Sequence, residues 1–339
     1  MATIYEVAAL AGVSTATVSR ALNGGSVSPE KARRVRDAAD SLNFTINRTA
    51  RDLRRQHSEV IALLVPDIEN PFFTALARGV EDRAQESGYS VVLCNTDDDP
   101  AKERRYLEIA DSANMAGVIL APAPEHTDLS GLLQRGKPVV AVDRATGFDI
   151  DAVMVDNRAI GAAATTALFD KGFQRVACIA GPLDAEAPEE RAEAWAQTVR
   201  ARGGVSAEPY LMHANYRVDG GRAAMSALLA LDPPPDAVVA TNNLMALGAL
   251  QVIGEAGLTP PGFGVAVCGD LPFSSFSPSV VTQVSIPARH LGTTAATLLL
   301  DRIGGDRQPA RTVVLRGKVL KSHPAPTTKH RTGRHRVAG

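Results

Sequence analysis

The segment from Ser14 to Asn23 has side chains of the types and spacing that can contact DNA bases. Its side chains are short and polar at Thr15, Thr17 and Ser19, and a single arginine follows at Arg20. A helix with such a surface fits into a DNA major groove without steric conflict, and arginine is the side chain best suited to a bidentate contact with guanine. This stretch therefore predicts a helix that lies in the major groove of double-stranded DNA.

Two helices joined by a tight turn are expected to present this segment. Thr3 and Glu6 have the spacing of a capping box, which satisfies two backbone donors at the start of a helix. Gly12 can adopt the left-handed conformation that ends that helix. Ser14 can then cap a second helix after a turn of about three residues, the length typical of a helix-turn-helix unit.

A third helix is predicted to begin at Ser28, with Pro29 at its first position. Its apolar positions can close a small core against the first two helices. The residues of this expected core are Val35, Ala38, Ala39 and Leu42, packed on Val7, Val13 and Val18. Residues 1–46 are therefore expected to form one small helical domain.

Charge is unevenly distributed along the 339 residues, whose net charge is −1. Residues 1–57 hold nine basic against five acidic side chains, the last sixteen residues hold four against none, and the stretch between them holds 23 against 32. A basic head favours contact with phosphates, and an acidic body does not. Mild basicity is also common in small domains, so charge alone does not identify the partner.

Residues 47–57 connect the head to the rest of the chain. Asn47 can cap a helix, but a run of about eight residues is too short to be stable alone in water. The run places Ala50 and Leu53 among four arginines. Two interpretations are open: a charged linker, or a hinge helix that folds only on DNA beside a second copy of the chain.

From Val60 onward, short apolar strands alternate with helices. Strands are predicted at 60–65, 90–94, 117–120, 139–142, 176–179, 210–212, 237–240, 265–267 and 312–315, and helices at 71–86, 100–113, 129–134, 160–169, 188–202, 220–229, 246–255 and 289–303. This alternation predicts an α/β fold with parallel sheets covered on both faces. We expect two doubly wound lobes with a cleft at the carboxyl ends of their strands.

The chain is predicted to cross between these lobes more than once. The first lobe is assigned residues 58–157 and 289–316, and the second lobe residues 158–288 and 317–323. Residues 324–339 are predicted to be disordered, because their composition offers too little apolar surface for a core.

Composition and motifs argue against several other classes of protein. No apolar run approaches the roughly 18 residues of a membrane span, and the first helix begins too early for a signal peptide, so we expect a cytoplasmic protein. Cys94, Cys178 and Cys268 lie in separate apolar runs, which is typical of reduced core thiols. The sequence holds no nucleophile elbow, zinc-protease motif or dinucleotide fingerprint. We therefore predict no enzymatic activity, cofactor or metal.

Two local patterns resemble ligand sites but have simpler explanations. The run from Gly131 to Pro138 nearly matches a phosphate-binding loop, yet it ends in proline and lies after a helix and before a strand, the reverse of the required order. Asp97, Asp98 and Asp99 are acidic residues of the kind expected at a helix start.

Several short motifs occur in the order seen in a known family. In the head they are Val7-Ala8, Gly12-Val13-Ser14, Thr17-Val18-Ser19-Arg20, Leu22-Asn23 and Val27-Ser28. Further along they are Asn47 to Leu53, Pro66-Asp67, Asn70-Pro71-Phe72-Phe73, Gly117-Val118-Ile119, Asp156-Asn157 and Ala246-Leu247-Gly248. With these motifs the sequence resembles the LacI/GalR family of bacterial transcription regulators from Thr3 to about His323. The resemblance implies a homodimer that binds a pseudopalindromic operator, and a body like the periplasmic binding proteins that binds a small-molecule effector.

The resemblance implies roles in DNA binding for individual residues. Thr15, Ala16 and Arg20 occupy the positions of base contacts. The positions of phosphate contacts are Ser14, Thr17, Ser19 and Asn23. In the hinge, Leu53 matches a leucine that wedges into the central base step, and the accompanying hinge contacts are Asn47, Arg48, Ala50 and Arg51.

The resemblance also implies a set of effector contacts. Phe72 and Phe73 correspond to apolar walls, and Arg191 to an arginine that clamps hydroxyls or a carboxylate. The other expected contacts are a stacking aromatic, an amide and three charged residues: Tyr216, Asn242, Arg144, Asp156 and Asp270. Plain core packing of the two phenylalanines and a solvated Arg191 are the alternative interpretations.

The expected cleft departs from the family pattern. Gly269 stands where the family usually has an aspartate, Ile286 replaces a polar residue of some members, and Ala194-Trp195 replaces a Gly-aromatic pair. Because sugar hydroxyls favour carboxylate acceptors, the missing aspartate weakens the case for an ordinary sugar effector.

We predict a ligand-responsive DNA-binding repressor. Lobe closure would change the spacing of the two hinge segments in a dimer, so that effector and operator affinities are coupled. Two other interpretations are open: a constitutive regulator whose cleft binds nothing, and an enzyme-like body on a DNA anchor. Concentration-dependent stabilisation by a metabolite separates the sensor from the constitutive regulator.

Replacing Leu53 with alanine is expected to lower operator affinity by a few kcal/mol, the scale of an unstacked base step, while the isolated body remains folded. The measurement is an operator titration at fixed salt. Unchanged affinity would contradict the assignment of Leu53 as a wedge.

Overall fold

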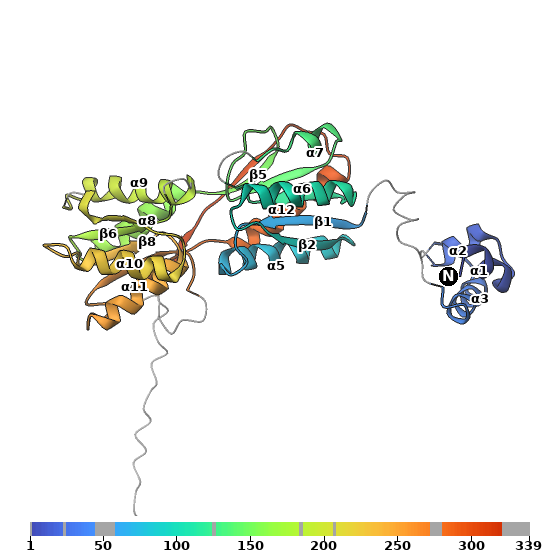
Figure 1. Cartoon of the computed structure of the whole chain (residues 1–339), viewed down its shortest axis with the longest axis horizontal. Helices are drawn as coiled ribbons and strands as arrows, with labels where there is room; N and C mark the ends of the chain where they lie inside the picture. The colour runs from blue at the N-terminus through green and yellow to red at the C-terminus, as the bar shows by residue number, and fades with distance from the viewer. Residues whose placement is uncertain are drawn as a thin grey trace, which may run out of the picture. The chain divides into compact units, whose positions relative to one another are not determined.

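The computed structural model describes residues 2–22, 25–44, 58–123, 127–182, 186–205, 208–271 and 280–320. The chain divides into two compact units, Met1–Ser58 and Glu59–Gly339, which are referred to below as the head and the body (Figure 1). Three predictions lie outside the described residues: the contact by Asn23, the hinge helix from Asn47 to Leu53, and the disordered tail.

The head contains the three predicted helices α1 (Ile4–Ala11), α2 (Thr15–Leu22) and α3 (Pro29–Ser41). The capping box at Thr3 and Glu6 is confirmed, with both reciprocal hydrogen bonds present. Gly12 ends α1 in the left-handed region, at φ 60°, so a residue without a Cβ is needed there. At the start of α2, the Ser14 hydroxyl accepts a hydrogen bond from the Thr17 backbone N–H at 3.2 Å.

The three helices of the head share a small apolar core. Val7, Val18 and Val35 are fully buried in it, and Val13 and Leu42 pack at its edge. The predicted start of α3, with Pro29 at its first helical position, is confirmed. Ser28 occupies the N-cap position of α3, but its side chain makes no capping hydrogen bond, and the start of the helix depends instead on Pro29, whose fixed φ is already helical.

In the described residues, the body holds two six-stranded sheets. The first has the order β11-β5-β4-β3-β1-β2, with bounds β1 Val60–Val65, β2 Ser90–Asn95, β3 Gly117–Leu120, β4 Val139–Val142, β5 Asp151–Val155 and β11 Thr312–Leu315. Its strands pair in parallel throughout. The helices around it are α5 Pro71–Glu86, α6 Pro100–Ser112, α7 Ser130–Gln134 and α12 Ala288–Ile303.

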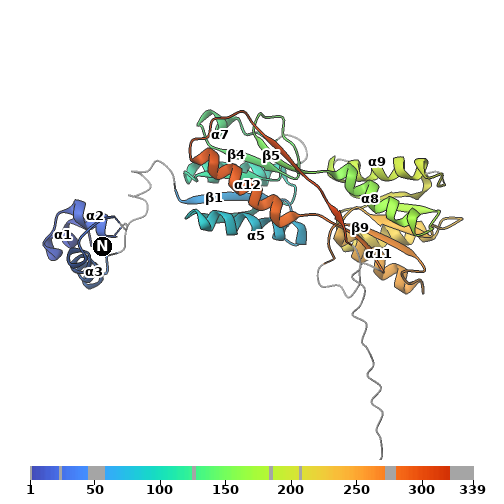
Figure 2. The same cartoon turned by 180° about the vertical axis from the view of Figure 1, so that it is seen from behind.

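Both faces of this first sheet are covered, as the continuous apolar strands predict. Along β1, Ile61, Leu63 and Val65 belong to the core that includes side chains of α5 and α12. Ala62 and Leu64 belong to a separate core with side chains of α6 and α7. The alternation follows from the two-residue period of a strand, and Figure 2 shows the helices on either side of the sheet.

The second sheet has the order β12-β10-β9-β8-β6-β7. Its strands are β6 Val176–Ala180, β7 Leu211–His213, β8 Ala237–Ala240, β9 Gly264–Cys268, β10 Thr282–Ser285 and β12 Lys318–Val319. Its helices are α8 Asn157–Asp170, α9 Glu186–Ala201, α10 Val218–Leu229 and α11 Asn243–Glu255. We call the first sheet with its helices the first lobe, and the second sheet with its helices the second lobe.

The chain passes between the lobes repeatedly. After the second sheet is nearly complete, α12 packs beside α5 in the first lobe and β11 joins the first sheet. The chain then returns, and β12 pairs antiparallel with β10 in the second sheet. Three strands, β5, β10 and β12, were not predicted, because they are short and contain polar or charged residues.

A buried carboxylate fixes the end of α12 to β5. The Asp151 side chain is fully buried and accepts hydrogen bonds from Arg302 Nε at 2.7 Å and Nη2 at 2.9 Å. The backbone N–H of Arg311 donates to the same carboxylate at 2.7 Å. Burial alone would raise the pKa of Asp151, but these donors stabilise the charged form and its pKa lies below the ordinary value.

Replacing Asp151 with asparagine should destabilise the body by up to about 3 kcal/mol, because a buried ion pair loses one partner. The contribution of Asp151 is full above the ordinary pKa of an aspartate, about 4, and is lost as the pH falls through its lower folded pKa. Urea unfolding at neutral and acid pH measures both effects. The control is Asp301→Asn at an exposed position of α12, and equal effects of the two substitutions would contradict the anchoring role.

Candidate functional site

A cavity of about 390 Å³ lies at the carboxyl ends of the strands of both sheets. Asp67 follows β1, Asp143 and Arg144 follow β4, Asn242 follows β8, and Gly269 follows β9. Parallel strands end at the same edge of a sheet, so residues far apart in sequence converge there. The volume lies within the range usual for small-molecule sites, about 300–1,000 Å³.

The two predicted aromatic walls line the cavity. Phe72 and Phe73 lie in the first turn of α5, with ring centroids 4.9 Å apart in an edge-to-face arrangement. Asn70 caps the helix by accepting a hydrogen bond from the Phe72 N–H at 3.0 Å. Phe73 also belongs to the core of the body, so it serves core packing as well as the cavity wall.

Arg191 also lines the cavity, and it is held by two hydrogen bonds within the second lobe. Its Nε donates to Asn157 Oδ1 at 2.9 Å, and its Nη1 donates to the Thr241 carbonyl at 2.7 Å. Only 7% of the residue is exposed, so the alternative of a solvated arginine is wrong. Within the described residues Nη2 makes no hydrogen bond, which leaves it available to a bound molecule.

A glycine contact between two helices positions Arg191. A Cβ added at Gly161 of α8 would lie 2.3 Å from the Arg191 carbonyl oxygen and 2.8 Å from its Cα. No real Cβ atom approaches backbone atoms so closely, so α9 can pack this close to α8 only because residue 161 is a glycine. The Arg191 guanidinium depends on this close approach for its place in the cavity.

Tyr216 and Asn242 meet at the second-lobe side of the cavity. Asn242 accepts a hydrogen bond from the Met245 N–H at 2.8 Å, as the N-cap of α11, and donates to the Tyr216 carbonyl at 2.9 Å. Tyr216 is held in the left-handed region, at φ 63°, a conformation that costs a non-glycine residue energy and is common at functional sites. Burial raises the pKa of the Tyr216 hydroxyl well above its usual range, so this hydroxyl stays protonated.

On the first-lobe side, Arg144 is nine-tenths buried and paired with Asp98. Its Nη1 donates to Asp98 Oδ1 at 2.5 Å and to the Pro122 carbonyl at 3.1 Å. Asp97 and Asp98 were expected at a helix start together with Asp99, but Asp99 alone caps α6. Both Asp97 and Asp98 adopt a φ of 55°, and this turn brings Asp98 to the cavity.

Asp143 is a cavity residue that was not predicted from the sequence. It lines the cavity with 7% of its surface exposed, and its carboxylate makes no hydrogen bond within the described residues. Burial raises its pKa, an effect that Arg144 and Arg191 partly offset. Its place directly after the predicted strand at 139–142, at the expected cleft edge, was the signal that could have identified it.

Of the predicted effector contacts, Asp156 alone does not line the cavity. Its carboxylate caps α8 by accepting a hydrogen bond from the Ala159 N–H at 3.0 Å. It also lies 3.9 Å from Arg316 Nε. Asp156 was expected at the effector cleft, but it lies outside this cavity, because the residue ends the turn into a helix and its side chain caps that helix.

The position of the missing aspartate has a structural explanation. Gly269 adopts a φ of 128°, a region that residues with side chains rarely occupy. Gly269, Asp270 and Ile286 all line the cavity. The cavity lining therefore still includes two aspartates, Asp270 next to Gly269 and Asp143.

On the head, the predicted DNA-contacting residues that the structure describes lie in α2 or directly before it. Ser14, Ala16 and Arg20 are exposed, while Val18 is fully buried and faces the core. Arg20 Nε donates to the Ala16 carbonyl at 3.3 Å. The remaining members, which are half-buried, are Thr15, Thr17 and Ser19.

A helix-turn-helix head and a two-lobed body with a cavity at the strand ends define the class of ligand-responsive DNA-binding regulators. Two family models match the chain: bacterial regulatory proteins of the lacI family over residues 3–47, and the periplasmic binding proteins and sugar binding domain of the LacI family over residues 58–323. The chain belongs to the LacI family. It is a DNA-binding transcriptional regulator of the repressor type with an effector-binding body.

Individual relatives agree with this assignment. The ribose operon repressor of Escherichia coli (strain K12) is 35% identical over 310 residues, which cover 89% of this chain and 93% of that repressor. The structure of the transcriptional regulator CelR in complex with cellobiose is 31% identical, with a TM-score of 0.69, and the match covers 95% of this chain and 99% of that one. The lac repressor dimer bound to operator and the anti-inducer ONPF matches at a TM-score of 0.81 over 95% of this chain and 98% of that one; at 23% identity it supports the fold alone.

None of the described helices combines the length and apolarity needed to cross a membrane. The described histidine, cysteine, aspartate and glutamate side chains form no group of three or more that could hold a metal ion.

Replacing Gly161 with alanine should destabilise the body by about 1–3 kcal/mol, because the added methyl group forces α9 away from α8. The matched control is Gly254→Ala, at a helical glycine with nothing within 4 Å of the added Cβ. That control should stabilise the protein by about 0.5–1 kcal/mol through the lower conformational freedom of alanine. Chemical denaturation measures both, and equal responses would contradict the close-approach argument.

Proposed function

We propose that this regulator binds a pseudopalindromic operator as a homodimer and that a neutral sugar in the cavity controls its DNA affinity. The lobes would change their closure when the sugar binds, and the hinge segments would carry that change to the heads. A protein that binds operator DNA in a bacterium acts in the cytoplasm. Because its relatives are transcriptional regulators, we propose no enzymatic activity.

For the DNA contacts, the proposal retains the residues expected from the sequence. Thr15, Ala16 and Arg20 contact bases, with Arg20 as the bidentate partner of a guanine. The phosphate contacts are assigned to Ser14, Thr17, Ser19 and Asn23. The hinge contacts are assigned to Asn47, Arg48, Ala50, Arg51 and Leu53.

The charges at the cavity favour a neutral, hydroxylated ligand. Several charged groups already have partners: Asp98 pairs with Arg144, Asp97 with Lys102, and Asp67 with Arg217. Among the described residues of the lining, the charged groups without a hydrogen bond or ion pair are the carboxylates of Asp143 and Asp270 and one end of the Arg191 guanidinium. An excess of carboxylates disfavours phosphorylated or acidic sugars, because like charges repel at short range in a partly buried site.

The buried carboxylate of Asp143 is the observation that carries this proposal. A carboxylate can accept hydrogen bonds from two hydroxyls at once, and Arg191 Nη2 can donate to a third oxygen. Tyr216 and Phe72 supply flat apolar surfaces for the carbon face of a sugar ring. Relatives whose names refer to ribose and cellobiose support the same ligand class.

Asp143→Asn should weaken sugar binding about 10- to 100-fold, the value of a hydrogen bond to a charged group, about 1.5–3 kcal/mol. Calorimetric titration with ribose, cellobiose and their acidic or phosphorylated counterparts measures the loss and the preference for neutral sugars. The control is Asp170→Asn, which alters an exposed ion pair with Arg202. The same sugars should change the operator affinity of the wild type, and should change that of the Asp143 variant only at correspondingly higher concentrations.

The pH dependence adds a second test of Asp143. Because its pKa is raised, the carboxylate becomes protonated at a higher pH than an ordinary aspartate and then loses acceptor capacity. Sugar affinity of the wild type should therefore fall on acidification before the other carboxylates titrate, and affinity of the asparagine variant should not. Tighter binding of acidic sugars, or full affinity in the variant, would contradict the proposal.

A further inference from the structure

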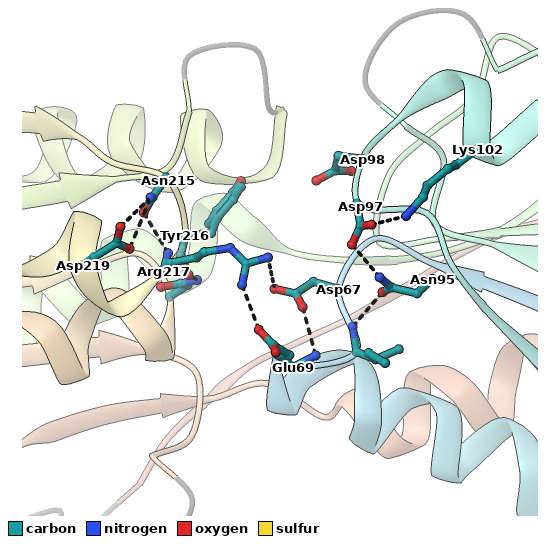
Figure 3. A network of polar contacts seen from close by, with 12 residues as sticks. Asp67, Glu69, Asn95, Asp97, Asp98, Lys102, Asn215, Tyr216, Arg217 and Asp219 are labelled. Carbon is teal, nitrogen blue, oxygen red and sulfur yellow. Dashed lines mark hydrogen bonds and ion pairs between the residues drawn. The ribbon is translucent and has the colours of Figure 1, made fainter.

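One arginine of the second lobe reaches across the cavity mouth to the first lobe. Arg217 Nη1 donates to Glu69 Oε2 at 3.0 Å, and its Nη2 lies 3.6 Å from Asp67 Oδ2. Glu69 and Asp67 follow β1, whereas Arg217 precedes α10. Figure 3 shows the guanidinium between the two carboxylates.

The first-lobe side of this contact is held in place by its own hydrogen bonds. The Asp67 carboxylate accepts from the Glu69 N–H at 2.9 Å. Asn95, at the end of β2, accepts from the Ile68 N–H at 2.9 Å and donates to Asp97 at 2.5 Å. Hydrogen bonds within the first lobe therefore support the loop that carries the two carboxylates facing Arg217.

The second-lobe side is equally constrained. The Arg217 N–H donates to Asn215 Oδ1 at 3.1 Å, and the Asn215 amide donates to Asp219 Oδ1 at 3.3 Å. A Cβ at Gly220 would lie 2.0 Å from Asn215 Oδ1, so the turn is closely packed. This turn also carries Tyr216. Tyr216, which faces the cavity, and Arg217, which reaches the other lobe, are therefore expected to move together.

We infer that Arg217, Glu69 and Asp67 form a latch that favours the closed arrangement of the two lobes and positions Tyr216 over the bound effector. The latch rests on the proposed sugar-sensing function but adds a new component to it. A ligand that contacts both lobes binds the closed form, and its apparent affinity scales with the fraction of protein that is closed. Loss of the latch lowers that fraction, and removal of the Glu69 side chain does so without changing the cavity lining.

Substitution of Glu69 distinguishes loss of the latch from loss of a direct ligand contact. Glu69 lies outside the cavity lining, whereas Arg217 and Asp67 are part of it. The ion pair is substantially exposed, with 48% and 75% of the Arg217 and Glu69 side chains accessible. Exposed pairs of this kind are weak and are screened by salt. A modest effect that disappears at high ionic strength is therefore the signature of the latch.

The first experiment measures ribose and cellobiose binding to full-length Arg217→Ala, Glu69→Ala and the double variant at low and high salt. Each single variant should bind about two- to ten-fold more weakly at low salt, and the double variant should lose little more than either single one, because both remove the same contact. The differences should vanish near 1 M salt. The control is Arg222→Ala, which breaks an exposed pair with Glu255 inside the second lobe and should leave affinity unchanged.

The second experiment needs no effector. Donor and acceptor dyes on Glu108→Cys in α6 and Arg200→Cys in α9 report the separation of the lobes, since both positions are exposed and the native cysteines are buried. Labelled chain is diluted with unlabelled chain so that transfer within one chain dominates. Arg217→Ala should lower the transfer efficiency of the ligand-free protein at low salt, and Arg222→Ala should not.

The two experiments separate the latch from the sugar-sensing proposal. Failure of the wild type to bind any sugar would count against the proposed function, and the energy-transfer result would still decide the latch. Unchanged energy transfer in Arg217→Ala, or wild-type sugar affinity in Glu69→Ala, would overturn the latch.

Discussion

The direction of the parallel strands is the constraint on which the rest of the body depends. Each crossover returns the chain to start the next strand from the same edge, so the loops that follow β1, β2 and β4 all emerge at one edge of the first sheet. The loops after β8 and β9 do the same in the second sheet. Polar residues that would be unremarkable in separate loops thereby become neighbours around one cavity.

Buried charge has two different consequences in this body. Asp151 is fully buried and receives donors from Arg302 and Arg311, so its charge is compensated and it joins two segments of the chain. Asp143 is nearly as buried but makes no hydrogen bond within the described residues. A carboxylate whose acceptor sites are filled stabilises the fold, whereas a buried carboxylate without hydrogen-bond donors keeps acceptor capacity that a ligand can use.

Close contacts between helices determine how accurately the cavity is built. Added Cβ atoms at Gly79 and Gly292 would each meet the backbone of the opposite helix at 2.0 Å, so α5, which carries Phe72 and Phe73, lies directly against α12. The contact of Gly161 with Arg191 has the same character. Packing without intervening side chains leaves these helices little freedom to shift. The cavity residues at the ends of these helices are therefore also held in position.

Local signals in the sequence were sufficient for the head, the α/β class and most elements of the body. Capping residues, apolar periodicity and glycine positions act over a few residues, so the capping box at Thr3 and the left-handed Gly12 could be predicted directly. Short strands with polar residues, such as β5 and β10, could not be predicted, because partners distant in sequence stabilise them.

The site residues also divide into those that local sequence motifs identify and those whose roles depend on partners distant in sequence. The resemblance of sequence motifs was enough to place Phe72, Arg191 and Tyr216 at the expected cleft. Only the tertiary structure decided that Asp156 caps a helix, that Asp143 faces the cavity, and that Arg217 crosses to Glu69. The physical reason is that a side chain's role depends on which donors and acceptors surround it, and the fold brings those groups together from segments far apart in the chain.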